Sequence, residues 1–546
     1  IIVTTALNYA NGSLHLGHML EDIQADIWVR FMRLTGHHCL FVSGNDAHGT
    51  PIMLSAEKRN ISPEDMVASI HDEHQRDIKD FHIDFDHFYT THSNENKHLV
   101  EHIYSQLKLG NHIETKTISQ AFDDEKNMFL PDRYIKGQCP YCKSEEQYGD
   151  NCETCGQTYQ PMELINPYSI LSGSKPSTKK SEHYFFKLEH FQGILETWIN
   201  QGELQDPVSN KLKEWFDQGL QSWDISRDAP YFGFKIPECQ DKYFYVWLDA
   251  PVGYMSTIKH LCQSQPELDF DAIWNPNSEV SLYHFIGKDI MYFHGLFWPA
   301  LLHGANYRLP SAIYAHGFLT INNEKMSKSR GTFITAREYL DHLNPEFLRY
   351  YFASKLQSGV DDIDLNIDDF VQKVNSDLIG KVINIASRCA KFINNDFQST
   401  LSARLHQPQM WQDWIDSGKD IALAYQERRF HQAIQAIMQL ADQANRYIAD
   451  QQPWKLIKNP EQKDEAHAVC SMGLHFFRML MLYLQPVIPA TSKKAFTFLQ
   501  VENLHWQNRS QLFLGHSIQP YQHILERIQP KDLPWQGSTP DDHQEK

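Results

Sequence analysis

The stretch that decides the fold is IIVTTALNYANGSLHLGH at residues 1–18, followed by HCLFVSGND at residues 38–46. The first seven residues are largely apolar, as in a buried strand, and the turn-rich NYANGS comes directly after them. Apolar residues at helical spacing then run from Leu14 to Leu34. A second apolar run ends in Asp46. Strand, helix and strand in this order predict a βαβ unit of a parallel sheet, and therefore a Rossmann-type α/β domain.

The first polar motif, His15-Leu16-Gly17-His18, stands where the predicted helix begins. A helix N-terminus offers unpaired backbone N–H groups and a partial positive charge, which suit a bound triphosphate. Residues three apart lie on one helical face, so both histidines could reach the same phosphates. Gly17 has no side chain and leaves room for an adenine ring against the backbone. Taken alone, the tetrapeptide is also consistent with two ordinary surface histidines.

The second polar motif is KMSKS at residues 325–329, in the segment NNEKMSKSRG. Its two ammonium groups, on Lys325 and Lys328, could neutralise the charge that develops on a leaving pyrophosphate. An ordinary exposed basic loop is the alternative when the motif stands alone. The ordered pair, HLGH near the start and KMSKS about 300 residues later, is far more specific than either motif.

Four of the nine cysteines form two CxxC turns, Cys139–Cys142 and Cys152–Cys155. Two such turns can present four thiolates tetrahedrally, which is the geometry of closed structural zinc sites. Four cysteine ligands leave no open position, so we expect a structural Zn²⁺ and not a catalytic one; free thiols are the alternative. An odd cysteine total with one tight cluster is typical of a reducing compartment, and predicts a cytoplasmic location.

The composition is that of an ordinary globular protein, with 41% hydrophobic and 22% charged residues. No apolar run approaches the roughly 18 residues of a membrane helix. The apolar opening has no basic segment before it, so we expect a buried strand there and not a signal peptide. The net charge of −18 argues weakly against a nucleic-acid partner, because phosphate contacts favour basic surfaces. Net charge says nothing about a local patch, however.

The paired motifs resemble those of the class I aminoacyl-tRNA synthetases, and the chain is similar to the methionyl-tRNA synthetases in particular. The matching stretches are ALNYANGSLHLGH, GNDAHGTPI, RDAPYFGF, VWLDAPVGYM, FIGKDIMYFH, HGFLTINNEKMSKSRG and KVINIASR. The resemblance implies ATP-dependent activation of L-methionine to methionyl-adenylate and its transfer to tRNA(Met), for initiation and elongation of translation. It implies catalytic roles for His15, His18, Lys325 and Lys328. ATP, with Mg²⁺, would be bound by His15, Gly17, His18, Gly287, Asp289, Lys325 and Lys328.

Methionine presents an ammonium, a carboxylate and a flexible thioether, so its site needs an anion and an apolar aromatic sleeve. Asp46 closes the second apolar run and is the natural partner of the ammonium; the family uses this position so. The resemblance assigns the remaining contacts to Ala6, Leu7, Tyr9, Trp247, Ala250, Pro251, Tyr254, His294 and Trp298. Tyr254 and His294 would lie nearest the sulfur. Plain core packing is the alternative for the aromatic residues, and Asn8 stands where many relatives have proline.

A last set of residues could bind RNA. Gly380, Asn384 and Arg388 are predicted to share one helical face. Asn and Arg can pair with the edges of splayed bases, and Trp454, presented by Pro453, can stack on one. By resemblance, the residues that read the anticodon are Asn384, Arg388, Pro453 and Trp454. Many relatives have Asn at the position of Gly380, so we expect no contact there. On the sequence alone, a buried Trp and a solvated helix face are the alternative.

These observations predict a Rossmann-type α/β catalytic domain with a zinc-binding connective insertion, followed by an all-α anticodon-binding domain. The expected units are the first half of the catalytic domain (1–109), the connective insertion with its zinc knuckle (110–225), the second half of the catalytic domain (226–319), a KMSKS-bearing linking domain that contacts the tRNA stem (320–375), the helical anticodon-binding domain (376–530) and a disordered tail (531–546). Relatives carry one or two knuckles. Residues 170–176 occupy the place of the second without cysteines, so one zinc, as in single-knuckle bacterial enzymes, is predicted.

Two rival functions are weighed against this one. The synthetases for isoleucine, valine and leucine share both motifs, but they carry a much longer editing insertion than residues 110–225. A zinc-ribbon RNA-binding protein without catalysis would have no use for HLGH, KMSKS and Asp46. A small HxGH nucleotidyltransferase would lack the helical C-terminal half. We expect no membrane partner and a monomer in this form, with a dimer as the alternative if a C-terminal extension is missing.

Overall fold

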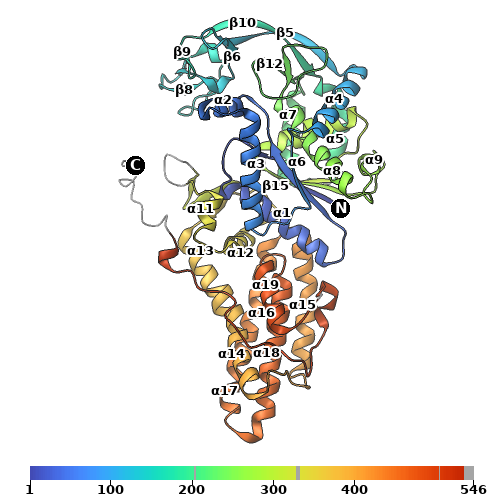
Figure 1. Ribbon diagram of the computed structural model, residues 1–546, viewed down its shortest axis with the longest axis vertical. Coiled ribbons are helices and arrows are strands. Elements are labelled where there is room, and N and C mark those ends of the chain that lie inside the picture. Colours follow the sequence, from blue (N-terminus) through green and yellow to red (C-terminus); the bar gives the residue numbers. More distant parts are fainter. Residues whose placement is uncertain (202–203, 327–332, 503, 534–546) are drawn as a thin grey trace.

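The computed structural model describes residues 1–201, 204–326, 333–502 and 504–533, without the side chain of Lys325. A parallel sheet stands at the centre of the upper half of the molecule (Figure 1). In it β1 pairs with β3 on one side and with β14 on the other, while β4 pairs with β3 and β15 with β14. The strands are β1 (Ile2–Thr5), β2 (Asn8–Tyr9), β3 (Leu40–Asp46), β4 (His87–Thr90), β14 (Leu282–Gly287) and β15 (Ala312–His316).

The predicted βαβ unit is confirmed. Strand β1 runs parallel to β3, and the helix between them, α1 (Leu16–Leu34), is buried along most of its length. Both strands are almost wholly buried, as expected for a parallel sheet covered by helices on its two faces. The short β2 continues from β1 along the end of β3, so that Tyr9 lies opposite Asp46. The loop between β1 and β2 therefore lies at the carboxyl end of the sheet.

Helices complete the two layers around this sheet. They are α2 (Thr50–Arg59), α3 (Pro63–Asp80), α4 (Asn94–Leu109), α7 (Val246–Asp249), α8 (Val252–Ser264), α9 (Phe270–Trp274) and α10 (Trp298–Gly304). The apolar run YFYVW at residues 243–247 predicts that the α/β pattern resumes with a strand, and this prediction is only partly right. The strand β13 (Lys242–Phe244) ends early, and Trp247 lies on the one-turn helix α7. The run SLYHFIG at residues 281–287 predicts a second strand, which is confirmed as β14.

The segment between α4 and β12 forms the top of the molecule in Figure 1. A sheet in the order β11-β10-β5-β6 is built on a long antiparallel pair, β5 with β10, and a small sheet in the order β8-β7-β9 carries the cysteines beside it. The elements are β5 (Ile113–Asp123), β6 (Met128–Phe129), β7 (Ile135–Gln138), β8 (Gln147–Tyr148), β9 (Ile165–Ser169), β10 (Ser177–Phe186), α5 (Gln192–Ile199), α6 (Asp206–Gln218), β11 (Trp223–Asp224) and β12 (Ser226–Asp228), the last pairing with β13.

A linking segment and a helical domain follow the sheet. The linking elements are β16 (Leu319–Ile321), β17 (Glu324–Lys325), α11 (Ala336–Leu340), α12 (Pro345–Lys355), β18 (Ile363–Leu365) and α13 (Ile367–Lys373). The predicted all-α domain is confirmed and extends downward in Figure 1. Its elements are a π-helix (Val374–Ile383), α14 (Asn384–Asp396), α15 (Pro408–Gln426), α16 (Phe430–Gln451), α17 (Pro453–Leu456), α18 (Lys463–Leu484) and α19 (Pro489–Leu499).

The expectation that no apolar stretch approaches the length of a membrane helix is not met. Among the described residues, helix α18 with the residues from Pro460 onward is long and apolar enough to cross a membrane by length and composition. Its most apolar window is 94% buried inside the helical domain. It packs against α14, α16 and α19, so its apolar character is explained by its place at the centre of the bundle.

The two halves of the molecule meet along α1. The carboxylate of Asp26 on this helix lies 2.6 Å from Nη2 of Arg349 on α12, and both side chains are buried. Nε of Arg349 donates to the carbonyl of Val487 in the helical domain. A second contact joins the indole of Trp28 to the carbonyl of Gln426, at 3.0 Å. A buried ion pair is tolerated when its remaining N–H groups are satisfied, as these are.

Candidate active site and metal centre

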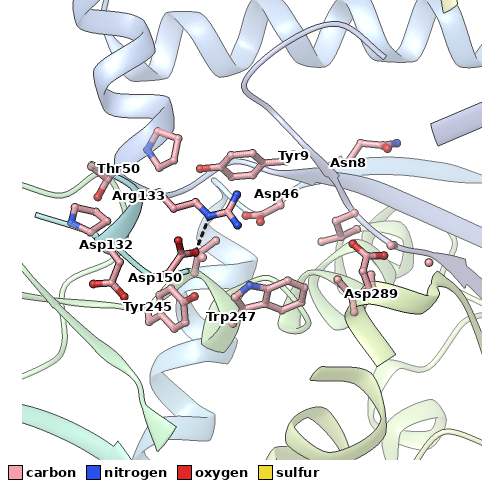
Figure 2. Close-up of a pocket in the computed structure, with 18 of the residues that line it drawn as sticks. Asn8, Tyr9, Asp46, Thr50, Asp132, Arg133, Asp150, Tyr245, Trp247 and Asp289 are labelled. Carbon is pink, nitrogen blue, oxygen red and sulfur yellow. Dashed lines mark hydrogen bonds and ion pairs between the residues drawn. The ribbon is translucent and has the colours of Figure 1, made fainter. Parts of the chain in front are cut away.

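A cleft of about 930 Å³ opens at the carboxyl ends of β1, β3 and β14, where ligand sites of open parallel sheets are found. Figure 2 shows side chains from the sheet, from β12–α7 and from the cysteine-bearing insertion converging on this space. Of the residues predicted from the sequence, ten line it: Ala6, Leu7, Tyr9, His15, Gly17, His18, Asp46, Trp247, Gly287 and Asp289. The structure thus brings together the HLGH motif, Asp46, Gly287 and Asp289.

The HLGH motif forms the N-terminus of α1. His15 is the N-cap: its Nδ1 accepts from the backbone N–H of Gly17, and its own N–H donates to Nδ1 of His18. The two rings stack with centroids 3.7 Å apart. Burial lowers the pKa of His18 well below its ordinary value, so this imidazole is neutral. Because its Nδ1 accepts, its proton must lie on Nε2, which is then a donor for a phosphate oxygen.

Described residues on both sides of residues 327–332 lie against this helix terminus. After the KMSKS motif, the N–H of Leu16 donates to the carbonyl of Ile334 and the N–H of Ala336 donates to the carbonyl of Leu14. Before residue 327, the methyl of Met326, the second residue of the motif, lies so close to Gly17 that a Cβ built there would come within 2.6 Å of it. The described residues next to 327–332 therefore lie beside the HLGH motif. Lys328 and the side chain of Lys325 lie outside the described residues.

Asp46 lies within the cleft, between Tyr9 and Trp247 in the view of Figure 2. Its Oδ1 is buried and has no hydrogen-bond partner among the described residues. Burial raises the pKa of Asp46 well above its ordinary value, and the nearby Asp249 carboxylate raises it further. A hydrogen bond from the backbone N–H of His48 lowers this pKa, but by less. An isolated buried carboxylate is unfavourable, and a cationic group brought to it would repay that cost.

The remaining predicted methionine contacts, Ala250, Pro251, Tyr254, His294 and Trp298, do not line the open cleft. They are buried behind it. Nδ1 of His294 donates to the carbonyl of Ile290, so its Nε2 accepts from the hydroxyl of Tyr254, at 2.8 Å. Trp298 donates to His284. Trp247 stacks on Phe293 with centroids 3.6 Å apart. A closed, hydrogen-bonded aromatic wall thus stands at the place where an apolar sleeve was expected.

Two contacts in the cleft are not predicted from the sequence: Glu21 with His316, and Arg227 with Tyr245. Glu21, one turn into α1, accepts from the N–H of Ala6 at 2.6 Å and from Nε2 of His316 at 3.1 Å. It fixes the end of β1 beside the cleft, yet in the sequence it is an ordinary acidic residue of a helix. Arg227 on β12 also faces the cleft, with its guanidinium 3.7 Å from the ring centroid of Tyr245. It lies in the quoted stretch RDAPYFGF, which was the signal that could have found it.

The four predicted metal ligands are confirmed as one cluster. The Sγ atoms of Cys139, Cys142, Cys152 and Cys155 all lie within 4.8 Å of one another. The shortest pairs are Cys142 with Cys152 at 3.5 Å and Cys139 with Cys155 at 3.8 Å. A Zn–S bond of about 2.3 Å places tetrahedral thiolates about 3.8 Å apart, so the donor set and its spacing fit zinc.

The predicted RNA-binding residues lie at the far end of the helical domain, near α17 in Figure 1. Asn384 begins α14 and Arg388 follows one turn later. The guanidinium of Arg388 lies 5.2 Å from the centroid of Trp454, which begins α17 together with buried Pro453. Gly380 falls in the π-helix before α14. Its spacing to Asn384 is therefore not the regular α-helical spacing that the sequence predicts.

The chain combines a Rossmann-type sheet, a cleft that carries HLGH at a helix N-terminus, Met326 of the KMSKS motif beside that terminus, and a helical domain. Together these features define a class I aminoacyl-tRNA synthetase. Comparison with known proteins agrees. Residues 1–390 match the family model described as "tRNA synthetases class I (M)", and residues 408–534 match the "anticodon binding domain of methionyl tRNA ligase". The chain therefore belongs to the class I tRNA synthetases (M), the ligases that join methionine to its tRNA.

Solved structures show the same fold. One is Mycobacterium tuberculosis methionyl-tRNA synthetase in complex with methionyl-adenylate, which is 24% identical, covers 96% of this chain and 99% of its own, and has a TM-score of 0.79. A second structure of the M. tuberculosis enzyme bound by methionyl-adenylate is 23% identical, with the same coverage and TM-score. The arrangement of all the domains is thus shared along nearly the whole chain.

Proposed function

We propose that the cleft activates L-methionine with ATP and that its residues play the parts given to them by resemblance. The observation that carries the proposal is the unpaired, buried Oδ1 of Asp46 beside the HLGH helix terminus. The cleft thus offers a desolvated anion next to an array of phosphate-binding donors, which are the groups that an amino-acid ammonium and a triphosphate need. Both structures of the M. tuberculosis enzyme are described with methionyl-adenylate bound, which supports this assignment.

The reaction needs no side chain as a nucleophile, because the methionine carboxylate attacks the α-phosphate and pyrophosphate leaves. The protein contributes position and charge stabilisation. The ammonium pairs with Asp46; Nε2–H of His18 and the backbone N–H groups of α1 face the phosphates; Gly17 leaves the adenine room. Asp289 and Gly287 hold the ribose, and Lys325 and Lys328 stabilise the departing charge. Mg²⁺ bound with ATP neutralises phosphate charge.

The thioether is assigned to the aromatic wall. Trp247 lines the cleft, and the side chains of Tyr254 and His294 lie behind it in mutual hydrogen bonding. We assign the sulfur contact to this pair, which presents a polar edge inside an otherwise apolar sleeve. Ala250, Pro251 and Trp298 complete the sleeve. Since these residues are buried in this structure, admission of methionine requires the wall, Trp247 in particular, to move.

Methionine-dependent exchange of pyrophosphate into ATP tests the proposal. The purified protein should catalyse exchange with L-methionine and not with isoleucine, leucine or valine. Exchange driven by one of these amino acids in place of methionine would assign the site to another synthetase of the class. The absence of exchange with any amino acid would contradict an adenylating cleft.

The insertion holds one structural Zn²⁺ in this proposal, through the thiolates of Cys139, Cys142, Cys152 and Cys155. Bound zinc would cross-link the small sheet, whose own apolar core is limited. The match of residues 408–534 to an anticodon-binding domain supports tRNA(Met) as the second substrate, read by Asn384, Arg388, Pro453 and Trp454. The domain boundaries given above, a cytoplasmic location and a monomeric form complete the proposal; most of the tail expected at 531–546 lies outside the described residues.

A further inference from the structure

A buried histidine joins the insertion to the cleft. His183 on β10 is fully buried, and both of its ring nitrogens face carboxylates. Nδ1 lies 2.7 Å from Oδ2 of Asp224 on β11, and Nε2 lies 2.9 Å from Oδ2 of Asp228 on β12. These two aspartates flank Arg227 in the sequence, and all three residues line the cleft.

The geometry fixes the charge of this histidine. An ionised carboxylate only accepts hydrogen bonds, so each ring nitrogen that bonds to one must carry a proton, and the ring is an imidazolium. Burial lowers the pKa of His183, but the hydrogen bonds to Asp224 and Asp228 outweigh burial and raise that pKa above its ordinary value. Two further cations face the cluster among the described residues: Arg227, and Lys242 on β13, whose Nζ lies 2.5 Å from Oδ1 of Asp228.

Arg227 shares one acceptor with this histidine. Its Nη1 lies 3.3 Å from Oδ2 of Asp224, the same oxygen that His183 contacts at 2.7 Å. Nη1 also donates to the carbonyl of Ser226, and the guanidinium covers the ring of Tyr245. A neutral His183 would have a single N–H for the two carboxylates. With that N–H on Asp228, Asp224 would be left to Arg227 alone, and the guanidinium would be bound more strongly by the protein's own carboxylate.

We propose that His183, as an imidazolium, is a positioning residue for Arg227: it occupies Asp224 and Asp228 and so leaves the guanidinium to an anionic group of the bound substrate. The proposal rests on the adenylating role of the cleft. That anionic group is the methionine carboxylate or a phosphate of ATP. His183 comes from the insertion, so the insertion takes part in adenylation through it, apart from its metal knuckle.

A double-substitution cycle tests this relation. Exchange kinetics would be measured for His183→Gln, Arg227→Ala and the chain carrying both. His183→Gln should lower kcat/KM by about tenfold, the size of a coupling between residues in one charge network. In the Arg227→Ala background the same change should have almost no further effect. His475→Gln, which removes an equally buried imidazole from the helical domain, is the matched control and should exchange like wild type.

A second combination covers the case in which His183→Gln folds poorly. Removing the carboxylate that competes for Arg227 should relieve the charge that the missing imidazolium leaves behind, so His183→Gln/Asp224→Asn should recover kcat/KM to within about twofold of wild type. Effects of His183→Gln and Arg227→Ala that multiply, or a double variant that shows no recovery, would overturn the proposal. A wild-type protein without exchange would instead refute the proposed function.

Discussion

The cleft and the anticodon end of the helical domain place their binding residues in opposite surroundings. In the cleft, Asp46, Glu21 and His18 are charged or titratable groups whose pKa values burial has shifted. At the far end, Arg388 and Trp454 are partly exposed planar groups resting on an apolar bundle. A small charged substrate is recognised by groups already removed from water, whereas RNA bases are met by flat, accessible surfaces. The two sites should therefore respond differently to substitution.

The largest effect is expected at Asp46. Asp46→Asn keeps the shape of the side chain but removes the partner of the substrate ammonium. Loss of one member of a buried charge pair should lower kcat/KM for methionine-dependent exchange on the order of a thousandfold. Steady-state kinetics of pyrophosphate exchange measure this loss of kcat/KM. Asp72→Asn, at an exposed position on α3, is the control. A loss smaller than tenfold would remove Asp46 from the ammonium site.

The next effect separates the two ends of the molecule. Trp454→Ala should lower charging of tRNA(Met) by roughly ten- to a hundredfold, the loss of one base-stacking contact of about 1–3 kcal/mol. Exchange without tRNA should stay unchanged, because the cleft lies in another domain. Trp454→Phe keeps an aromatic face and should recover most of the charging.

The competing interpretation of Trp454 is core packing, and it makes a different prediction. Removing a core tryptophan costs about 3–5 kcal/mol, so the melting temperature would then fall clearly. Normal charging by the folded fraction of a destabilised Trp454→Ala protein would rule out the RNA contact. Poor charging with normal melting would support it.

The raised pKa of Asp46 makes methionine binding depend on pH. In the free protein the carboxyl holds its proton more tightly than usual, and the substrate ammonium favours the charged form. At a pH near or below that raised pKa, binding releases a proton, so affinity should fall as the pH falls further, by up to about tenfold per unit. Calorimetric titrations in two buffers of different ionisation enthalpy would detect the released proton. An affinity that is flat across this range would show that Asp46 is already ionised.

The smallest effect on catalysis is expected at the metal site. Wild-type protein purified under reducing conditions should contain one zinc per chain, and Cys152→Ser should lose it, with faster hydrogen exchange confined to the knuckle. Exchange activity should drop no more than severalfold. Cys262→Ser, distant from the cluster in the sequence, should keep its zinc. Retention of zinc by Cys152→Ser, or its absence from wild type, would contradict a four-cysteine site.

Much of this architecture could be predicted because its signals are local. The βαβ unit follows from two apolar runs around a periodic helix, and the metal cluster follows from two CxxC turns. The pairs that were missed depend on the folded structure. Glu21 and His316 are 295 residues apart in the sequence, and the contact of Arg227 with Tyr245 in the cleft forms only when the chain folds. Local spacing also failed where backbone geometry changes, at the one-turn helix that carries Trp247 and at the π-helix that carries Gly380. Which aromatic residues line the open cleft, and which lie behind it, depends on packing that no spacing encodes.

Helix α1 has a further consequence for how this molecule can vary. Its first turn holds His15 and His18 at the cleft. Its later turns carry Asp26, which pairs with Arg349 of the linking segment, and Trp28, which contacts the helical domain. Each residue added to or deleted from a helix rotates everything beyond it by about 100°. A single insertion between His18 and Asp26 would turn either the phosphate site or the docking face away from its partner. We therefore expect this stretch of chain to tolerate substitutions but not changes in length, unlike the loops that surround it.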